Sequence, residues 1–243
     1  MTDLRNRVAL VTGGSRGIGR AIAVSLADAG AAVAVNYREK QAEAEAVVAA
    51  IKAKGGKAVA VRADVSQAAE VARMMAEVER VLGAVDVLVN NAGVGLVRSV
   101  DDLTEADFDL TIAVNLKSVF LCTQAVIPAM RARRWGRIVN ISSGAARGAG
   151  GVGPHYNASK AGMEGMTRGY AARLVKDGIT VNAVAPSLIE TDMVKQGLAS
   201  AASRIPLGRF GTPEECAQIV LMLAGNAYMT GQTVALSGGM SFL

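Results

Sequence analysis

The sequence is poor in the side chains that most often bind metals or form disulfides. Among 243 residues there are two cysteines, Cys122 and Cys216, and one histidine. The cysteines lie far apart and match no metal-ligand spacing, so we expect no metal site. We interpret both as small buried apolar side chains in a reducing compartment. A chain of this length buries roughly 70 to 75% of the surface that its unfolded form exposes, so it needs no crosslink.

Aromatic residues are also scarce, at 4% of the chain, although the net charge is +5. The basic residues are dispersed except for one cluster of Arg131, Arg133, Arg134 and Arg137. Nucleic-acid binding usually combines a basic face with aromatic side chains for base stacking, and these are few here. We therefore expect no nucleic-acid partner and interpret the cluster as a solvated basic patch. An anionic cofactor or substrate accounts for the charge at least as well.

The sequence lacks long apolar runs. Its first five residues lead straight into an apolar strand, which leaves no room for the apolar region of a signal peptide. No segment approaches the apolar length of a membrane span. We therefore expect a cytoplasmic protein with no membrane partner.

Short apolar segments alternate with helical segments along the whole chain. We predict strands at 7–12, 31–35, 57–62, 85–89, 137–141, 179–184 and 233–236, and helices at about 18–29, 40–54, 67–82, 105–134, 156–176 and 213–223, with Ser66 as an N-cap. Such alternation demands a parallel sheet with helices on both faces. The chain contains no internal repeat or linker, so residues 1–243 are predicted to form one α/β domain, a Rossmann-type doubly wound sheet of about seven strands. Ligands of such sheets collect beyond the carboxyl ends of the strands.

A glycine-rich turn joins the first predicted strand to the first predicted helix. Gly13, Gly17 and Gly19 form the pattern Thr-Gly-x-x-x-Gly-x-Gly. Glycines in this context let the backbone turn sharply and approach a pyrophosphate at the helix N-terminus. The turn therefore predicts a dinucleotide site.

The choice between NAD and NADP depends on the end of the second predicted strand. An acidic residue there would bind the ribose hydroxyls and repel a 2′-phosphate. This chain instead has Asn36, Tyr37 and Arg38, with no acid before Glu39. Arg16 in the turn and Arg38 supply two cations, and the arginine fork suits phosphate geometry. We predict that the cofactor is NADP(H).

Three residues around the fifth predicted strand suggest ketone chemistry. Tyr156 and Lys160 lie four residues apart, so on a helix they share a face. A free phenol has a pKa of about 10, and a neighbouring ammonium lowers that value toward the useful range. Ser143, at the end of the strand, could then hydrogen-bond a carbonyl oxygen that Tyr156 protonates.

These residues also carry a resemblance to the short-chain dehydrogenase/reductase family. Five segments match it in order: residues 12–19, residues 90–93, Asn115, the set of Ser143, Tyr156 and Lys160, and residues 186–191. The resemblance implies that Tyr156 is the general acid in reduction and that Lys160 lowers its pKa and holds the nicotinamide ribose. It further implies that Asn115 kinks a helix and anchors a water of a proton relay, although Asn115 could be only a helix-bend residue.

The resemblance also extends the predicted cofactor site. It implies that Asp64 and Val65 meet the adenine, that residues 91–93 support the adenine-side ribose, and that Ile189 and Thr191 close on the nicotinamide amide and pyrophosphate. The complete predicted set is Gly13, Ser15, Arg16, Gly17, Ile18, Gly19, Asn36, Tyr37, Arg38, Asp64, Val65, Asn91, Ala92, Gly93, Tyr156, Lys160, Ile189 and Thr191.

Three neighbours of these segments receive other interpretations. For Asn90 we favour a purely structural role. His155 invites a Ser-His reading with Ser143, but it directly precedes Tyr156 and points away from it on a helix, so we interpret it as a bystander at the site mouth. Ser187 stands where family members often have glycine, which puts the local path of its loop in doubt.

Within the family the chain most resembles the 3-oxoacyl-thioester reductases, including the acetoacetyl-CoA reductases. The resemblance rests on residues 182–186, 189–193, 230–232 and 237–240. It implies a substrate lid at about 187–210, whose apolar residues could form a pocket or equally pack the lid onto the body. It also implies a homotetramer, with which the apolar tail 240–243 is compatible, and possible contact of Arg134 with an acidic acyl carrier protein. Asp177 occupies a place that is often basic in carrier-dependent relatives, so a CoA thioester or a free ketone stays open.

The leading hypothesis is thus an NADPH-dependent reductase of 3-oxoacyl thioesters. One alternative is a broad carbonyl reductase, or an alcohol or sugar dehydrogenase, of the same family. A remote alternative is a noncatalytic nucleotide-binding regulator. The four residues Asn115, Ser143, Tyr156 and Lys160 are all present, which a binding-only protein does not require.

Overall fold

Seven parallel strands form a single sheet in the computed structural model, which describes residues 2–191 and 199–241. Their order is β3-β2-β1-β4-β5-β6-β7, so the strand order reverses between β1 and β4. The predicted doubly wound arrangement is therefore confirmed. The strands are β1 Val8–Val11, β2 Ala32–Tyr37, β3 Ala58–Arg62, β4 Val87–Asn90, β5 Gly136–Ile141, β6 Ile179–Pro186 and β7 Thr233–Leu236.

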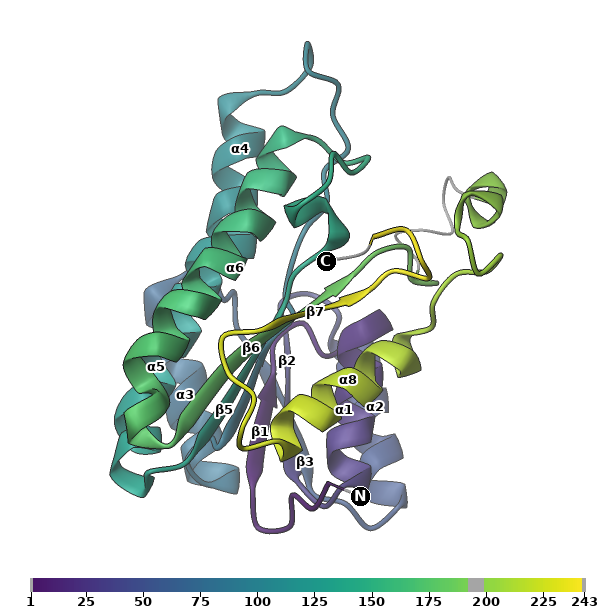
Figure 1. Cartoon of the computed structure of the whole chain (residues 1–243). Helices are drawn as coiled ribbons and strands as arrows, with labels where there is room; N and C mark the ends of the chain where they lie inside the picture. Colours follow the sequence, from purple (N-terminus) through teal and green to yellow (C-terminus); the bar gives the residue numbers. More distant parts are fainter. Residues whose placement is uncertain (1, 192–198, 242–243) are drawn as a thin grey trace.

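Helices cover both faces of this sheet (Figure 1). One face carries α1 Gly17–Asp28, α2 Gln41–Ala53 and α8 Pro213–Gly225, and the other carries α3 Ala68–Leu82, α5 Ser118–Arg133 and α6 Pro154–Leu174. The helix α4 Glu105–Ile112 and the upper part of α6 extend together beyond the sheet. Short helical turns, η2 Gly144–Ala146, η3 Val175–Asp177 and η4 Ala199–Arg204, and the π-helical turn η1 Ala113–Lys117 complete the described elements.

The two layers of core follow from the period of two along the strands. On β1, Ala9 and Val11 belong to the core cluster on one side, whereas Leu10 belongs to the cluster on the other. Leu88 on β4 lies beside Leu10 in the sheet and shares its side. Both faces of a central strand must therefore be apolar, which explains why these strands read as uninterrupted hydrophobic runs.

The start of α3 differs from the prediction. Gln67 occupies the N-cap position, and the hydroxyl of Ser66 donates to Oδ1 of Asp64 at 2.7 Å. The backbone amide of Ser66 donates to the same oxygen at 2.9 Å. Ser66 is therefore not the N-cap, because the carboxylate two residues earlier draws both its donors into a local turn.

One helix corrects the expectation that no segment approaches a membrane span. A five-residue π-turn, η1 Ala113–Lys117, joins α4 to α5 into the continuous run Glu105–Arg133. By length and composition alone, this run is long and apolar enough to cross a bilayer. Half of its most apolar window is buried inside the protein.

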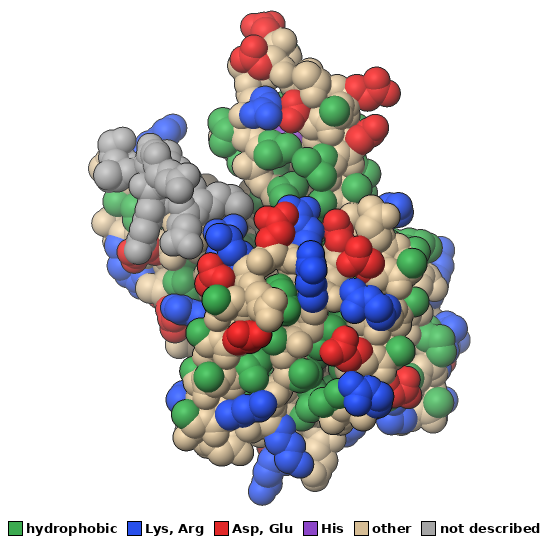
Figure 2. Space-filling model, turned by 180° about the vertical axis from the view of Figure 1, so that it is seen from behind, with side chains coloured by type: hydrophobic (Ala, Val, Ile, Leu, Met, Phe, Trp, Pro, Cys, Tyr) green, Lys and Arg blue, Asp and Glu red, His purple; other side chains and the backbone are tan. Residues whose placement is uncertain are grey.

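Surface charges of both signs alternate over the face seen from behind (Figure 2). Acidic side chains gather at the tip of the α4 end of the molecule, and basic side chains are frequent at the opposite end. Within the described residues, many of them are paired, as in the contacts of Lys54 with Asp28 and of Arg131 with Asp177.

Candidate active site

A cavity of about 660 Å³ opens at the carboxyl ends of the strands, at the point where the strand order reverses. The predicted site residues come together there from the ends of β1 to β6, the loops that follow them, and the helices α1 and α6. All of them line the cavity except Asn115, which is fully buried behind its wall. The topology of the sheet thus assembles side chains that are up to 178 positions apart, from Gly13 to Thr191.

The glycine turn needs its glycines for two different reasons. Gly13 and Gly17 have φ angles of +59° and +53°, which side-chain-bearing residues rarely adopt. Gly19 lies so close to the turn that a Cβ atom there would collide with the carbonyl oxygen of Gly13 and with Nδ2 of Asn91. The turn is followed directly by the N-terminus of α1, where backbone amides favour an anion.

Two asparagines brace this turn. Oδ1 of Asn36 accepts from the Gly13 amide at 3.1 Å, and its Nδ2 donates to the carbonyl of Ala63 at 3.1 Å. Nδ2 of Asn91 donates to the carbonyl of Gly13 at 3.0 Å. These side-chain groups are engaged with the protein itself, so we attribute to both residues a supporting role in the cofactor site.

Arg16 and Arg38, the two cations predicted to bind a 2′-phosphate, have different surroundings. Arg38 forms an ion pair with Glu39, with 2.6 Å between Nη2 and Oε1, and both side chains are largely exposed. Arg16 is exposed at the start of α1, and no ion pair to it occurs in the described part of the chain. Glu39 and Lys40 line the cavity as well. From the sequence, Glu39 lies beyond the position that selects between NAD and NADP. In the structure it lines the cavity and pairs with Arg38.

Asn115 sits in the π-turn, where the helix is distorted as the resemblance implied. Its Oδ1 accepts from the Val94 amide at 2.8 Å, and its Nδ2 donates to the Val94 carbonyl at 2.9 Å and to Oγ of Ser159 at 3.2 Å. The side chain therefore fixes the segment after β4 to the helix that bears the catalytic candidates. A Cβ on Gly93 would stand 3.3 Å from Oδ1 of Asn115 and 3.6 Å from Nζ of Lys160, so this corner has little spare room.

Ser143, Tyr156 and Lys160 meet at the end of β5. Ser143 follows that strand in extended backbone, and α6 carries the other two on one face. Lys160 is 4% exposed, and its Nζ donates to the carbonyl of Ile141 at 2.8 Å. Nζ lies 5.7 Å from the centre of the Tyr156 ring. The ammonium is therefore hydrogen-bonded to the strand end and lies near the Tyr156 ring.

Burial dominates the electrostatics of both Tyr156 and Lys160. Burial raises the pKa of the Tyr156 phenol above its usual value, while a hydrogen bond with Ser143 acts in the opposite direction. Burial lowers the pKa of Lys160 to about 8. Desolvation and the Ser143 hydrogen bond account for the shift of the Tyr156 pKa, and the expectation that Lys160 lowers this pKa stays a prediction.

Comparison with known proteins decides the family. A family model described as short chain dehydrogenase matches residues 7–201. The chain belongs to the short-chain dehydrogenase family. It is therefore classed with oxidoreductases.

Among curated members of the short-chain dehydrogenase family, a 3-oxoacyl-(acyl-carrier-protein) reductase of Synechocystis sp. is 45% identical over 99% of both chains. The BbsD subunit of a hydroxy(phenyl)methylsuccinyl-CoA dehydrogenase of Thauera aromatica is 41% identical over 98% of both chains. Among solved structures, a dehydrogenase/reductase from Sinorhizobium meliloti 1021 superposes with a TM-score of 0.90 at 40% identity, covering 98% of this chain and 96% of that one. The predicted resemblance to this family and to its 3-oxoacyl-thioester reductases is confirmed.

The structure adds lining residues that sequence reasoning missed. They are Glu39, Lys40, Ala63, Val94, Val114, Ile141, Ser142, Pro186 and Ser187. Most are sequence neighbours of a predicted residue near the end of a strand. Position at a strand end was therefore the signal that could have found them. The loop at Ser187 does not need the positive φ that a glycine would allow, because Ser187 is not among the described residues with positive φ. Its Oγ instead packs against Gly144, where a Cβ would stand 2.6 Å from it.

Neighbouring polar residues have structural contacts. Nδ2 of Asn90 donates to Oδ1 of Asn140 at 2.8 Å inside the core, in agreement with a structural role. His155 is 1% exposed, and its Nε2 lies 3.1 Å from the carbonyl of Leu96. It is therefore buried beside the loop after β4 and not at the site mouth.

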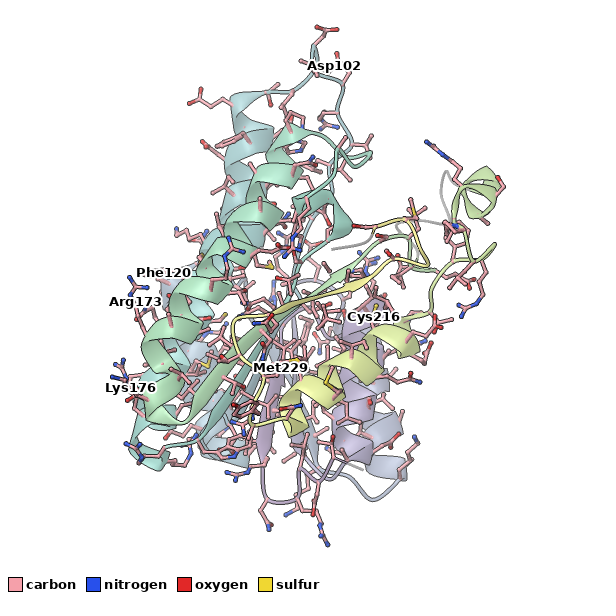
Figure 3. The ribbon with its side chains drawn as sticks, in the orientation of Figure 1. Asp102, Phe120, Arg173, Lys176, Cys216 and Met229 are labelled. Carbon is pink, nitrogen blue, oxygen red and sulfur yellow. The ribbon has the colours of Figure 1, made fainter. Side chains whose placement is uncertain are left out.

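Parts of two predicted regions lie outside the described residues. These are the lid residues Met193 and Leu198 and the tail residues Phe242 and Leu243. Both cysteines are buried, as expected, and burial raises the pKa of each thiol to about 12. Cys216 lies on α8 (Figure 3).

Proposed function

We propose that this chain is an NADPH-dependent reductase that converts a 3-oxoacyl thioester into the 3-hydroxyacyl thioester. The observation that carries the proposal is the single cavity that joins the glycine turn to Ser143, Tyr156 and Lys160. A nucleotide held at one end and a proton donor at the other are the two requirements of carbonyl reduction. The names of the relatives support the choice of thioester.

The residues present fit a bound dinucleotide. The cradle of Gly13, Gly17 and Gly19 is open because none of them carries a Cβ, and the start of α1 adds backbone amides suited to a pyrophosphate. Arg16 and Arg38 stand at the rim, where guanidinium groups suit a 2′-phosphate. When bound, NADPH supplies the hydride that reduces the carbonyl carbon.

The protein's own groups manage the oxygen and its proton. Tyr156 donates its phenolic proton to the carbonyl oxygen, and the raised pKa keeps that proton in place at neutral pH. Ser143 donates a hydrogen bond to the same oxygen as charge develops on it. Lys160, with a pKa of about 8, is mostly protonated at neutral pH and stabilises the phenolate that remains. Asn115 fixes the segment after β4 to the π-turn, and a proton relay to solvent would pass beside Lys160.

The choice between a carrier protein and coenzyme A depends on the basic cluster near the end of α5. Nη2 of Arg134 donates to the carbonyl of Lys176 at 2.9 Å, and Arg131 pairs with Asp177 at 2.7 Å. Asp177 thus neutralises part of the surface that an acidic carrier would meet. We propose a CoA thioester as the better substrate and keep acyl carrier protein as the second.

The deciding assay follows the loss of NADPH absorbance with acetoacetyl-CoA, with acetoacetyl carrier protein, NADH and a simple aryl ketone run alongside. Turnover of the thioester with NADPH supports the proposal. Activity confined to the aryl ketone, or dependent on NADH, would favour a broad carbonyl reductase or an alcohol or sugar dehydrogenase. Binding of NADPH without turnover of any ketone would favour the noncatalytic regulator. Tyr156→Phe is the matched control, because it removes only the hydroxyl.

We further propose that the chain is one cytoplasmic domain with a substrate lid at about 187–210, assembled as a homotetramer. The exposed apolar side chains Phe108, Leu110 and Phe120 on α4 and α5 support an assembly face. Phe120 points outward on the same side of the molecule as Arg173 and Lys176 (Figure 3). In the described part of the lid, the Leu207 amide donates to the Gly238 carbonyl at 3.1 Å. A monomer in size-exclusion chromatography with light scattering would refute the tetramer.

A further inference from the structure

A buried carboxylate lies next to the catalytic candidates without belonging to them. Glu164 is 3% exposed and follows Lys160 by four residues and Tyr156 by eight on α6. Residues at this spacing lie above one another on one face of a helix. Glu164 is therefore the third member of the stripe that carries the phenol and the ammonium.

Each oxygen of this carboxylate holds a different part of the loop after β5. Oε2 of Glu164 accepts from Nε of Arg147 at 2.8 Å. Oε1 accepts from Oγ of Ser142 at 3.2 Å. Ser142 immediately precedes Ser143, and Arg147 immediately follows the turn η2 Gly144–Ala146 that begins after Ser143. The two contacts therefore bracket Ser143 on both sides.

The position of Glu164 explains why a carboxylate is found in a buried environment. A buried ion pair contributes little net stability compared with apolar packing, but removal of one partner leaves an uncompensated charge. Such a pair fixes a geometry. Here the fixed geometry is that of the segment 142–147 against the helix face that carries Tyr156. The Glu164 side chain is only 4% exposed, whereas the Arg147 side chain is 37% exposed.

We propose that Arg147 and Glu164 are positioning residues that hold the Ser143 hydroxyl in register with Tyr156. This inference rests on the proposed ketone reduction. The latch, meaning the Arg147–Glu164 pair together with Ser142, acts on turnover through Ser143. None of its contacts involves the glycine cradle, so we expect NADPH binding to change little when it is broken.

The first test compares Glu164→Gln, Arg147→Lys and Arg147→Met with the wild type. A displacement of order 1 Å at a reacting group can cost about 100-fold in rate, so a loosened loop should lower kcat by about tenfold. The KM for NADPH should stay within about twofold. Asp28→Asn is the matched control, because it removes an exposed ion pair with Lys54 on the far side of the molecule and should leave kcat unchanged.

A second background separates positioning from a general loss of structure. In Ser143→Ala, the further change Glu164→Gln should lower kcat by less than about twofold, because the group through which it acts is gone. Equal tenfold losses in both backgrounds would overturn the proposal. So would wild-type kcat in all three latch variants.

A third measurement does not need turnover, so it separates failure of this inference from failure of the proposed function. Hydrogen exchange followed by mass spectrometry should speed up in residues 143–153 in Glu164→Gln and Arg147→Met, and not in Asp28→Asn. Unchanged exchange there overturns the latch, whether or not the wild type reduces a ketone. If exchange is faster in the latch variants but the wild type reduces no ketone, the proposed function is wrong. The latch would then be a restraint on the loop without a role in turnover.

Discussion

Asn36 offers the sharpest test of how the cofactor site is built. Its Oδ1 accepts from the Gly13 amide, and its Nδ2 donates to the carbonyls of Ala63 at 3.1 Å and Val61 at 3.3 Å. Asn36 is 2% exposed, so Asn36→Ala would remove these hydrogen bonds from a largely buried position. Each lost hydrogen bond of this kind costs on the order of 1 kcal/mol. Three of them give a loss of about 3 kcal/mol in the free energy of unfolding.

For a chain of this size, 1 kcal/mol corresponds to a change in Tm of about 2 to 4 °C. We therefore expect Asn36→Ala to lower Tm by roughly 6 to 12 °C, measured by circular dichroism in the absence of cofactor. The Kd for NADPH should rise as well, because the braced Gly13 turn loosens. A Tm within 2 °C of the wild type, combined with weaker NADPH binding, would refute the bracing role and make Asn36 a direct cofactor contact.

Further predictions follow from burial and close approach. Lys160→Met should abolish reduction while raising the free energy of unfolding at pH 7 by up to about 3 kcal/mol, since burial lowers the folded-state pKa of Lys160 to about 8 from 10.5. The folded protein releases this proton at a lower pH than the unfolded chain does. The free-energy penalty of burying the Lys160 ammonium is therefore fully present below pH 8 and fades as pH rises from 8 toward 10.5. In denaturant unfolding, the stability advantage of Lys160→Met over the wild type should be smaller at pH 10 than at pH 7. Gly19→Ala should weaken NADPH binding at least tenfold in a fluorescence titration, because its Cβ would meet the carbonyl of Gly13, and binding like that of the wild type would contradict the close approach. Cys122 and Cys216 should resist alkylation at pH 8 in the native state and react after unfolding in SDS, since burial raises both thiol pKa values to about 12; rapid native labelling would contradict their burial.

Several features of the fold were predictable because their causes are local. The strands around Leu10 and Leu88 are short and apolar on both faces, a pattern that only a sheet covered on both sides can satisfy. Glycine at positions 13 and 17 reports a backbone conformation that other residues avoid. Element ends were less certain, as Ser66 shows, because a carboxylate two residues away competes for its donors.

The site was predictable as a set of positions more than as a set of contacts. The spacing of Ser143, Tyr156 and Lys160 anticipates that they meet, since a strand end and one helix face bring them together. The same spacing says nothing about the direction of the Lys160 ammonium, which donates to the carbonyl of Ile141. It also does not show that Glu164 continues the stripe, because its partner Arg147 comes from a loop with no periodic pattern.

The sequence by itself determined the order of the elements, the glycine cradle and the candidate reacting groups, because each depends on neighbours within a few positions along the chain. Only the tertiary structure decided which polar groups were already engaged and how far water was excluded from them. Asn36 reaches Ala63 across 27 positions, and Asn115 reaches Val94 across 21. The pKa shifts of Tyr156 and Lys160 arise from desolvation by the packed elements around them, a quantity that no short stretch of sequence contains.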